Sequence, residues 1–144
     1  MLGKLHFRRA PVPEEQTCRC FACGGDFVAS TRAVSARCPH CGRSVALQDI
    51  VITGPRWMGT VQTCGRVIVE RKGKLVASLV ETGAGVAVLG AIEARVVSQG
   101  FVLLGAKGKW KGDCRAVTIL MEPGAQVDGG KFEIAGGIPM ELGE

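Results

Sequence analysis

The 144-residue sequence contains no tyrosine, only 5% aromatic residues and two histidines. So few aromatic side chains exclude a large aromatic-filled core, which leaves valine, isoleucine, leucine and alanine as the main apolar residues. With so few histidines, general acid–base catalysis has few candidate residues. The sequence also lacks a Walker-type phosphate-binding motif. We therefore expect a protein that is not an enzyme, with no catalytic and no organic-cofactor-binding residues.

Long hydrophobic runs are also missing. No segment approaches the roughly 20 apolar residues that a membrane-spanning helix needs, and residues 1–9 lack the apolar core and cleavage site of a signal peptide. The seven cysteines are odd in number, and five of them lie between Cys18 and Cys41 at spacings typical of metal ligands. This pattern opposes a secreted disulfide scaffold. The sequence therefore predicts a cytoplasmic protein, with association with the inner face of the membrane as an open alternative.

The two ends of the chain differ from its middle. Residues 1–48 carry seven Lys or Arg against three Asp or Glu, and residues 1–16 are typical of a flexible basic head that ends in a proline-containing linker. Within this head, Leu2, Leu5 and Phe7 alternate with cations and are candidates for contact with an anionic membrane surface. A frayed terminus is the alternative. We expect residues 135–144 to form a flexible tail.

Residues 17–46 contain two Cys-x-x-Cys-Gly motifs whose cysteines are Cys20, Cys23, Cys38 and Cys41. The two-residue gap lets a tight turn present both thiolates of a pair to one ion, and the following glycine permits a positive φ where the backbone bends under the sulfurs. Four thiolates leave no open position for substrate, so the motifs predict a zinc ribbon with one structural Zn²⁺ ion. An iron centre with the same ligands and a disulfide pair are alternatives.

Other residues of this module have less certain roles. Cys18 is a fifth thiol, but only Cys20 has the two-residue spacing to Cys23, so the role of Cys18 stays open. We expect the ring of His40 to face solvent. The arginines of the module could contact phosphates, which makes nucleic acid a less favoured partner. They are Arg19, Arg32, Arg37 and Arg43.

Residues 49–134 contain hydrophobic triplets that recur between glycines. Their centres are 17, 19, 16 and 15 residues apart, and the triplets are Ile50-Val51-Ile52, Val67-Ile68-Val69, Val86-Ala87-Val88, Val102-Leu103-Leu104 and Val117-Thr118-Ile119. Two further columns of apolar residues can be drawn at the same period. One comprises Val61, Ala77, Ile92, Trp110 and Val127, and the other comprises Cys64, Leu79, Val96, Cys114 and Phe132.

Three short strand-like segments in each period are typical of a β-helix, in which each turn has three sides and successive turns stack. We therefore predict an all-β fold, with a right-handed three-sided β-helix (β-solenoid) over residues 49–134 after the small zinc ribbon. Small aliphatic residues suit its narrow interior, where Cys64 and Cys114 are expected to be buried. An antiparallel β-sandwich is the competing fold, but it would show more hairpin turns of the Asn-Gly or Asp-Gly type than Asp128-Gly129.

The end of this region resembles the last turns of a bactofilin domain. The residues that carry the resemblance are Gly112-Asp113-Cys114, Val117-Thr118-Ile119 and Pro123-Gly124-Ala125-Gln126-Val127-Asp128-Gly129-Gly130. The resemblance covers about 85 residues, through residue 134, and the closing Gly-Ala-x-Val-x-Gly element is its most specific part. It implies a bacterial cytoskeletal scaffold that polymerises without nucleotide into non-polar filaments, through contacts between the ends of its β-helix.

Elementary physics makes such self-assembly plausible, because the first and last turns of a β-helix expose unpaired strand edges and an open core. The candidate polymer interface comprises Ile50, Val51 and Ile52 at one end, with Phe132 and Ile134 at the other. The zinc ribbon would then be a docking module for another protein. The alternative function is a nucleic-acid-binding regulator that reads through its zinc ribbon and is oligomerised by its β-helix.

Overall fold

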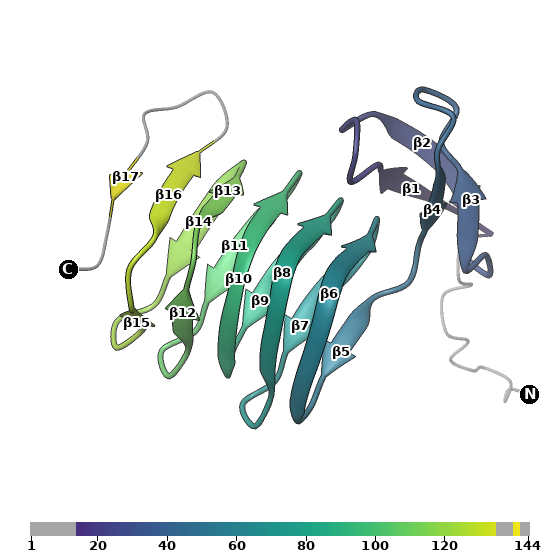
Figure 1. Ribbon diagram of the computed structural model, residues 1–144. Coiled ribbons are helices and arrows are strands. Elements are labelled where there is room, and N and C mark those ends of the chain that lie inside the picture. The colour runs from purple at the N-terminus through teal and green to yellow at the C-terminus, as the bar shows by residue number, and fades with distance from the viewer. Residues whose placement is uncertain (1–13, 135–139, 142–144) are drawn as a thin grey trace, which may run out of the picture.

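The structure is a computed structural model that describes residues 14–134 and the strand at 140–141. The described residues form seventeen β-strands and no helix (Figure 1). Among them, no helix is long and apolar enough to cross a membrane. The predicted membrane contacts Leu2, Leu5 and Phe7 lie outside the described residues, as does most of the predicted tail.

Each turn of the larger module begins with a short strand. These strands are β5 (Ile50–Ile52), β7 (Arg66–Val69), β9 (Gly85–Val88), β11 (Phe101–Leu104) and β14 (Thr118–Met121). They pair in parallel in the order β14-β11-β9-β7-β5, which forms a five-stranded sheet that we call the short-strand sheet. Five short strands correspond to five turns of a solenoid.

A longer strand completes each turn. The first three are β6 (Pro55–Thr63), β8 (Lys74–Thr82) and β10 (Ala91–Ser98), and the last two turns divide this strand into β12 (Lys109–Lys111) with β13 (Cys114–Ala116), and β15 (Gln126–Val127) with β16 (Lys131–Ile134). These strands also stack in parallel, and β17 (Met140–Glu141) adds antiparallel to β16. We call them the long-strand sheet. Parallel stacking throughout the turns confirms the predicted β-solenoid and is incompatible with an antiparallel sandwich.

The registers confirm four of the five hydrophobic triplets. Val51, Ile68, Ala87 and Leu103 are successive partners, but the next partner is Leu120 and not the predicted Thr118. The reason is that Val117 lies before the last short strand and donates its N–H to Gly100 O at 3.0 Å. The last triplet is therefore centred two residues later than expected.

The other two predicted columns were wrong in their first two members: Val61 lies in the column of Val96, and Cys64 lies in neither column. Ile92 pairs with Leu75, and Val96 pairs with Val80, so Ala77 and Leu79 do not belong in those columns. One contribution is a register shift between Glu93 and Arg95, where β8 has one more residue than β10, so that the spacing between the two columns differs from turn to turn. The observed inward columns are Leu75, Ile92, Trp110 and Val127, and then Val61, Val80, Val96, Cys114 and Phe132.

The solenoid interior is almost entirely aliphatic, with its bulk supplied by valine, isoleucine and leucine. Its two aromatic rings, Trp110 and Phe132, pack near the C-terminal turns with centroids 5.4 Å apart. One corner carries a buried polar row of Thr63, Thr82 and Ser98. The Thr82 hydroxyl donates to Ser98 Oγ at 3.2 Å, and the Ser98 hydroxyl donates to Phe101 O at 3.0 Å. Side-chain hydrogen bonds therefore stabilise this corner in addition to strand pairing.

The predicted zinc-ribbon segment, called the ribbon below, forms two short hairpins. One pairs β1 (Glu15–Arg19) with β2 (Asp26–Ser30), and the other pairs β3 (Ser35–Arg37) with β4 (Ser44–Ala46). Phe21, Phe27, Val45 and Leu47 supply its small apolar core. In Figure 1 this module lies beside the ends of β6 and β8, at the corner of the first turns.

Candidate metal centre and its junction with the solenoid

The two Cys-x-x-Cys turns bring four sulfur atoms together. Sγ atoms of all four predicted ligands lie within 4.8 Å of one another, and these residues are Cys20, Cys23, Cys38 and Cys41. Gly24 and Gly42 have φ values of 76° and 75°, which confirms that each turn needs a glycine after its second cysteine. The N–H groups of Ala22 and Gly25 each lie 3.4 Å from a cysteine sulfur and donate to it, which stabilises negative charge there.

The sulfur–sulfur distances fit a tetrahedral metal shell. A bond of about 2.3 Å between zinc and sulfur would place the sulfurs of such a shell about 3.8 Å apart. In the structure, Cys20 Sγ and Cys41 Sγ are 3.9 Å apart, and Cys23 Sγ and Cys38 Sγ are 3.7 Å apart. The four cysteines can therefore bind one metal ion without rearrangement, and none of these distances is that of a disulfide.

Cys38 shows how the backbone prepares the site for a thiolate. Burial by itself disfavours the charged form of this side chain, but N–H groups of Cys41 and His40 and neighbouring thiols outweigh burial. Together they lower the pKa of Cys38 to about 7. The coupled thiol of Cys23 is the opposite: the Gly25 N–H favours its thiolate, but burial and the neighbouring thiols outweigh that hydrogen bond and raise its pKa to about 12, so metal binding must displace a proton there.

The neighbouring residues are arranged around the site without joining it. His40 places Nε2 2.7 Å from Asp26 O, which ties its ring to the backbone of β2 and away from the sulfur cluster. Cys18 is buried in the apolar core of the ribbon, where burial raises the pKa of its thiol. Cys18 therefore acts as a small hydrophobic residue of the core. Its spacing to the other cysteines in the sequence did not indicate this role.

Two of the arginines that could have contacted phosphates have intramolecular partners. Arg19 Nε is 3.1 Å from Asp26 Oδ1, and Arg19 Nη1 donates to Gln99 O at 2.8 Å. Arg37 Nη1 donates to Gly42 O at 2.9 Å. These guanidinium groups stabilise the ribbon and its attachment, so fewer cations remain for a phosphate backbone.

Cys64 joins the ribbon to the solenoid. It was expected in a solenoid column, but it lies at the corner after β6 and packs in the ribbon core with Cys18, Phe21 and Leu47. Its N–H donates to Ala46 O at 2.8 Å. Burial raises the pKa of Cys64 to about 11. Cys114 lies inside the solenoid, as predicted, and burial raises its pKa to about 12. Both thiols are therefore neutral at physiological pH and unsuited to nucleophilic chemistry.

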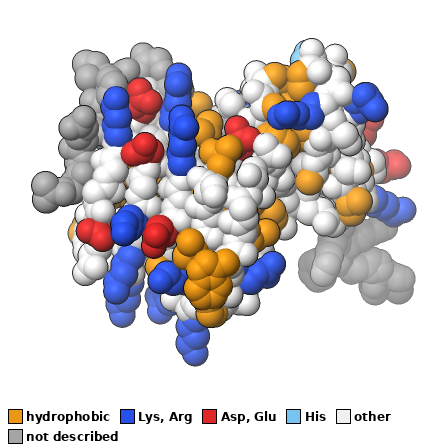
Figure 2. Space-filling view, in the orientation of Figure 1, with side chains coloured by type: hydrophobic (Ala, Val, Ile, Leu, Met, Phe, Trp, Pro, Cys, Tyr) orange, Lys and Arg blue, Asp and Glu red, His pale blue; other side chains and the backbone are white. Residues whose placement is uncertain are grey.

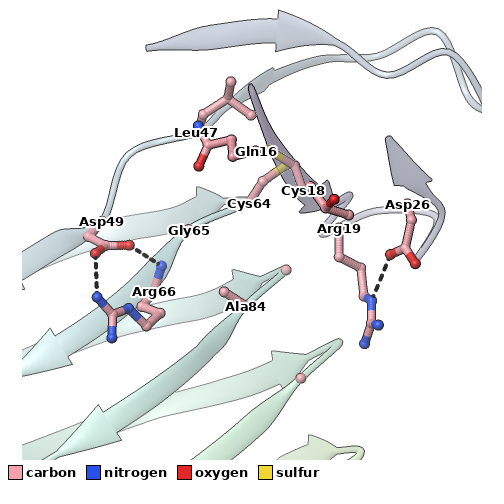
Figure 3. Close-up of a pocket in the computed structure, with 13 residues that line it drawn as sticks. Gln16, Cys18, Arg19, Asp26, Leu47, Asp49, Cys64, Gly65, Arg66 and Ala84 are labelled. Atoms are coloured by element: carbon pink, nitrogen blue, oxygen red, sulfur yellow. Dashed lines mark hydrogen bonds and ion pairs between the residues drawn. The ribbon is translucent and has the colours of Figure 1, made fainter. Parts of the chain in front are cut away.

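The ribbon also contacts the second and third turns. A Cβ at Gly83 would overlap the carbonyl oxygen of Arg19, so only glycine permits this approach. Gln99 Nε2 donates to Phe21 O at 3.4 Å. Figure 3 shows the cleft between β1 and this corner, with Asp49 and Arg66 on the solenoid side. Its volume is about 510 Å³.

The fold and the repeat now allow comparison with known proteins. A model of the bactofilin family, described as polymer-forming cytoskeletal, matches residues 33–131, which is more than half of the chain. The chain belongs to the bactofilin family. This is a structural, cytoskeletal family and not a family of enzymes. Searches of curated proteins and of solved structures gave no significant match.

The bactofilin match covers the whole solenoid up to the start of β16 and begins within the ribbon, before β3. The first ribbon hairpin, with Cys20 and Cys23, therefore precedes the matched region. The four-sulfur cluster combines two cysteines from outside the family match with two from inside it.

The structure places the predicted interface residues at both ends of this bactofilin solenoid, with different exposure. Val51 is 45% exposed, Ile50 is half-buried, and Ile52 is fully buried in the first turn. At the other end, Phe132 is fully buried inside the core and Ile134 is half-buried. Phe132 thus does not lie on an exposed surface, because its side chain points inward against Trp110.

Sequence reasoning missed one exposed residue near the first turn. Trp57, on β6, is 72% exposed. Next to it, Arg56 is exposed at the register position that Leu75 and Ile92 fill inside the next two turns. The break in the apolar column at Arg56 was a signal available in the sequence, but only a correct register reveals it.

Proposed function

We propose that this bactofilin assembles, without a nucleotide, into filaments through contacts between the ends of its solenoid. The observation that supports the proposal is the pairing of the two outermost strands of the short-strand sheet. Within the described residues, β5 pairs only with β7, and β14 pairs only with β11. Among the residues that the structure describes, each end therefore presents a strand edge without a second strand partner, which another copy can pair with.

The side chains of the first turn support the same proposal. Ile50 occupies an inward position at the open end of the solenoid and is half-buried, and Val51 beside it is exposed. Stacking a second solenoid against this end would bury Ile50 and extend the aliphatic core, and it would cover the edge of the outward-pointing Val51. At the other end, Ile134 is the candidate with surface still to bury, whereas Phe132 supports that end from inside.

For the metal centre, we propose a structural zinc ion bound by the four cysteines. A four-sulfur shell leaves no coordination position for chemistry, so the ion would hold the ribbon together. The ribbon would dock another protein, because Val28 and Val34 on its surface are 60% and 57% exposed. We place the protein in the cytoplasm, where thiols stay reduced, and contact between its head and the inner face of the membrane stays a prediction.

Electron microscopy of the purified full-length chain tests the assembly. We expect filaments in nucleotide-free buffer. Ile50→Lys should abolish them, because end-to-end stacking would bury the new charge. In the isolated subunit the open end leaves that charge in water, so circular dichroism should be unchanged.

The matched control is Ser78→Lys, which adds the same charge at an exposed position in the second turn. It should still form filaments. A wild-type protein that stays monomeric at high concentration would contradict the proposed function, and intact filaments of Ile50→Lys would show that the contact lies elsewhere.

A further inference from the structure

The outer face of the short-strand sheet carries a continuous apolar stripe. Alternation puts one residue from the middle of each short strand outward, and the registers align these residues from turn to turn. We call them the outer stripe: Val51, Ile68, Ala87, Leu103 and Leu120. The two end members are 45% and 55% exposed, and the three between them are half-buried by their neighbours. Beside the stripe, the ring of Phe101 covers Gly85.

This face has almost no charge. In its five strands the charged residue is Arg66, whose Nη2 lies 2.9 Å from Asp49 Oδ2. The long-strand sheet, by contrast, carries many charged residues. Figure 2 shows Lys, Arg, Asp and Glu side chains spread over its turns. The charged residues of its strands from β6 to β16 are Arg56, Lys74, Glu81, Glu93, Arg95, Lys109, Lys111, Arg115, Lys131 and Glu133. A solvated face of a solenoid is expected to resemble the second sheet and not the first.

We propose that the outer stripe is a lateral contact surface, on which two filaments of this chain pack face to face. This inference rests on the proposed function. The occupant is a second copy because its stripe has the same spacing of about 4.8 Å between turns, so the side chains of two stripes can interdigitate as in stacked sheets about 10 Å apart. An uncharged face also carries no like charges to repel its own copy across a twofold axis.

The area of the face explains why single subunits would not pair. Five strands at about 4.8 Å by four residues at about 3.3 Å give about 300 Å² on each copy. Stable complexes bury about 800 Å² on each partner. In a filament the stripe repeats with every subunit, so many weak contacts act together and lateral pairing follows end-to-end assembly.

The experiment measures the fraction of paired filaments in electron micrographs. Wild-type filaments should be paired or bundled. Ala87→Lys, in the third of five turns and far from both ends, should give single filaments, because its stem can lie along the stripe while its charge blocks packing. Ser78→Lys, with the same charge on the long-strand side, should leave pairing unchanged. Leu103→Gln should also reduce pairing. Because it adds no charge, it tests whether the loss of pairing requires a lysine.

Mixing provides a test that a change in folding would not reproduce. Filaments of Ala87→Lys and of Ala87→Glu should each be single, and a mixture of the two should pair again, because opposite charges then meet across the contact. Wild-type filaments that stay single, paired Ala87→Lys filaments, or a mixture that stays single would overturn the lateral contact. Absence of filaments in the wild type would instead contradict end-to-end assembly.

Discussion

The ribbon and the solenoid are both small β-structures, but different forces hold them together. The ribbon has two short hairpins and an apolar core built around Phe21, Phe27, Val45 and Leu47, which is too little to fold a module of about thirty residues without a metal or disulfides. The solenoid stacks five turns, and each turn covers the apolar interior of the one before. The comparison indicates that the ribbon depends on its four-sulfur site, whereas the solenoid depends on the repetition of its turns.

Removing the proposed zinc ion should produce the largest difference between the two modules. Structural zinc contributes about 10–16 kcal/mol to the folding of zinc-finger peptides. A chelator should therefore unfold residues 17–46 and leave the solenoid folded. Hydrogen exchange read by mass spectrometry should show lost protection in β1–β4 and retained protection in β7–β11.

A genetic pair repeats this test without a chelator. Cys20→Ser should lose the bound metal and show the same exchange pattern, whereas Cys18→Ser should keep a full equivalent of metal. Loss of protection in the solenoid to the same extent as in the ribbon would show that the two modules do not fold separately.

Core substitutions should act on the solenoid alone. Phe132→Ala removes a fully buried ring that packs against Trp110, so it should lower the free energy of unfolding by about 3–5 kcal/mol. Urea denaturation measures this change, and the bound metal should stay at wild-type level.

The two tryptophans provide a matched comparison for the same experiment. Trp110→Ala empties a position that is 1% exposed, and Trp57→Ala changes one that is 72% exposed. The first should destabilise the solenoid by about 3–5 kcal/mol and the second by at most about 0.5 kcal/mol. Equal effects would show that the assigned interior is wrong.

A substitution at the junction should affect the contact between the modules. Gly83→Ala would press a methyl group against the carbonyl oxygen of Arg19, which should cost about 1–3 kcal/mol. Faster hydrogen exchange in β1 and around Gln99 would report the loosened junction. Gly59→Ala is the control, since nothing lies within 4 Å of its Cβ position, and unchanged exchange in Gly83→Ala would refute the close approach.

The smallest effect should come from the ion pair between Asp49 and Arg66. Burial opposes ionisation of Asp49, but hydrogen bonds from the backbone N–H and guanidinium of Arg66 outweigh it and lower its pKa in the folded state. Its contribution should be complete above the unfolded pKa of about 3.9 and lost as the pH falls through the lower folded value.

Because both side chains are 40% or more exposed, the pair should contribute at most about 1 kcal/mol. Urea midpoints measured at pH 6 and pH 3 should converge between wild type and Asp49→Asn as the pH falls. A gap that widens at low pH would reverse the sign of this prediction.

The parts of the structure that depend on local spacing could be predicted from the sequence. The Cys-x-x-Cys-Gly motifs defined the four-sulfur cluster because a tight turn determines their geometry within five residues. The first four triplets defined their short strands because each of these turns repeats one inward–outward–inward pattern. The long strands were predicted less well, because one extra residue in β8 shifts the register between Glu93 and Arg95.

Other features depend on contacts between modules, which no repeat pattern encodes. Cys64 follows a β-strand and has the size of a column residue, but it is buried by the ribbon and not by the next turn. Trp57 and Trp110 have the same side chain, and only the register makes one of them exposed and the other part of the core. Gly83 resembles an ordinary corner glycine until the ribbon is placed against it.

The hydrogen bond between Arg19 and Gln99 joins residues that are 80 positions apart in the chain. During synthesis, all four cysteines emerge before the first turn of the solenoid, so the four-sulfur cluster can form before the solenoid does. The corner against which it packs is complete only after the third turn has formed. The complete junction can therefore form only after Gln99 has been synthesised, and a chain that stops short of Gln99 would lack part of the corner against which the ribbon packs.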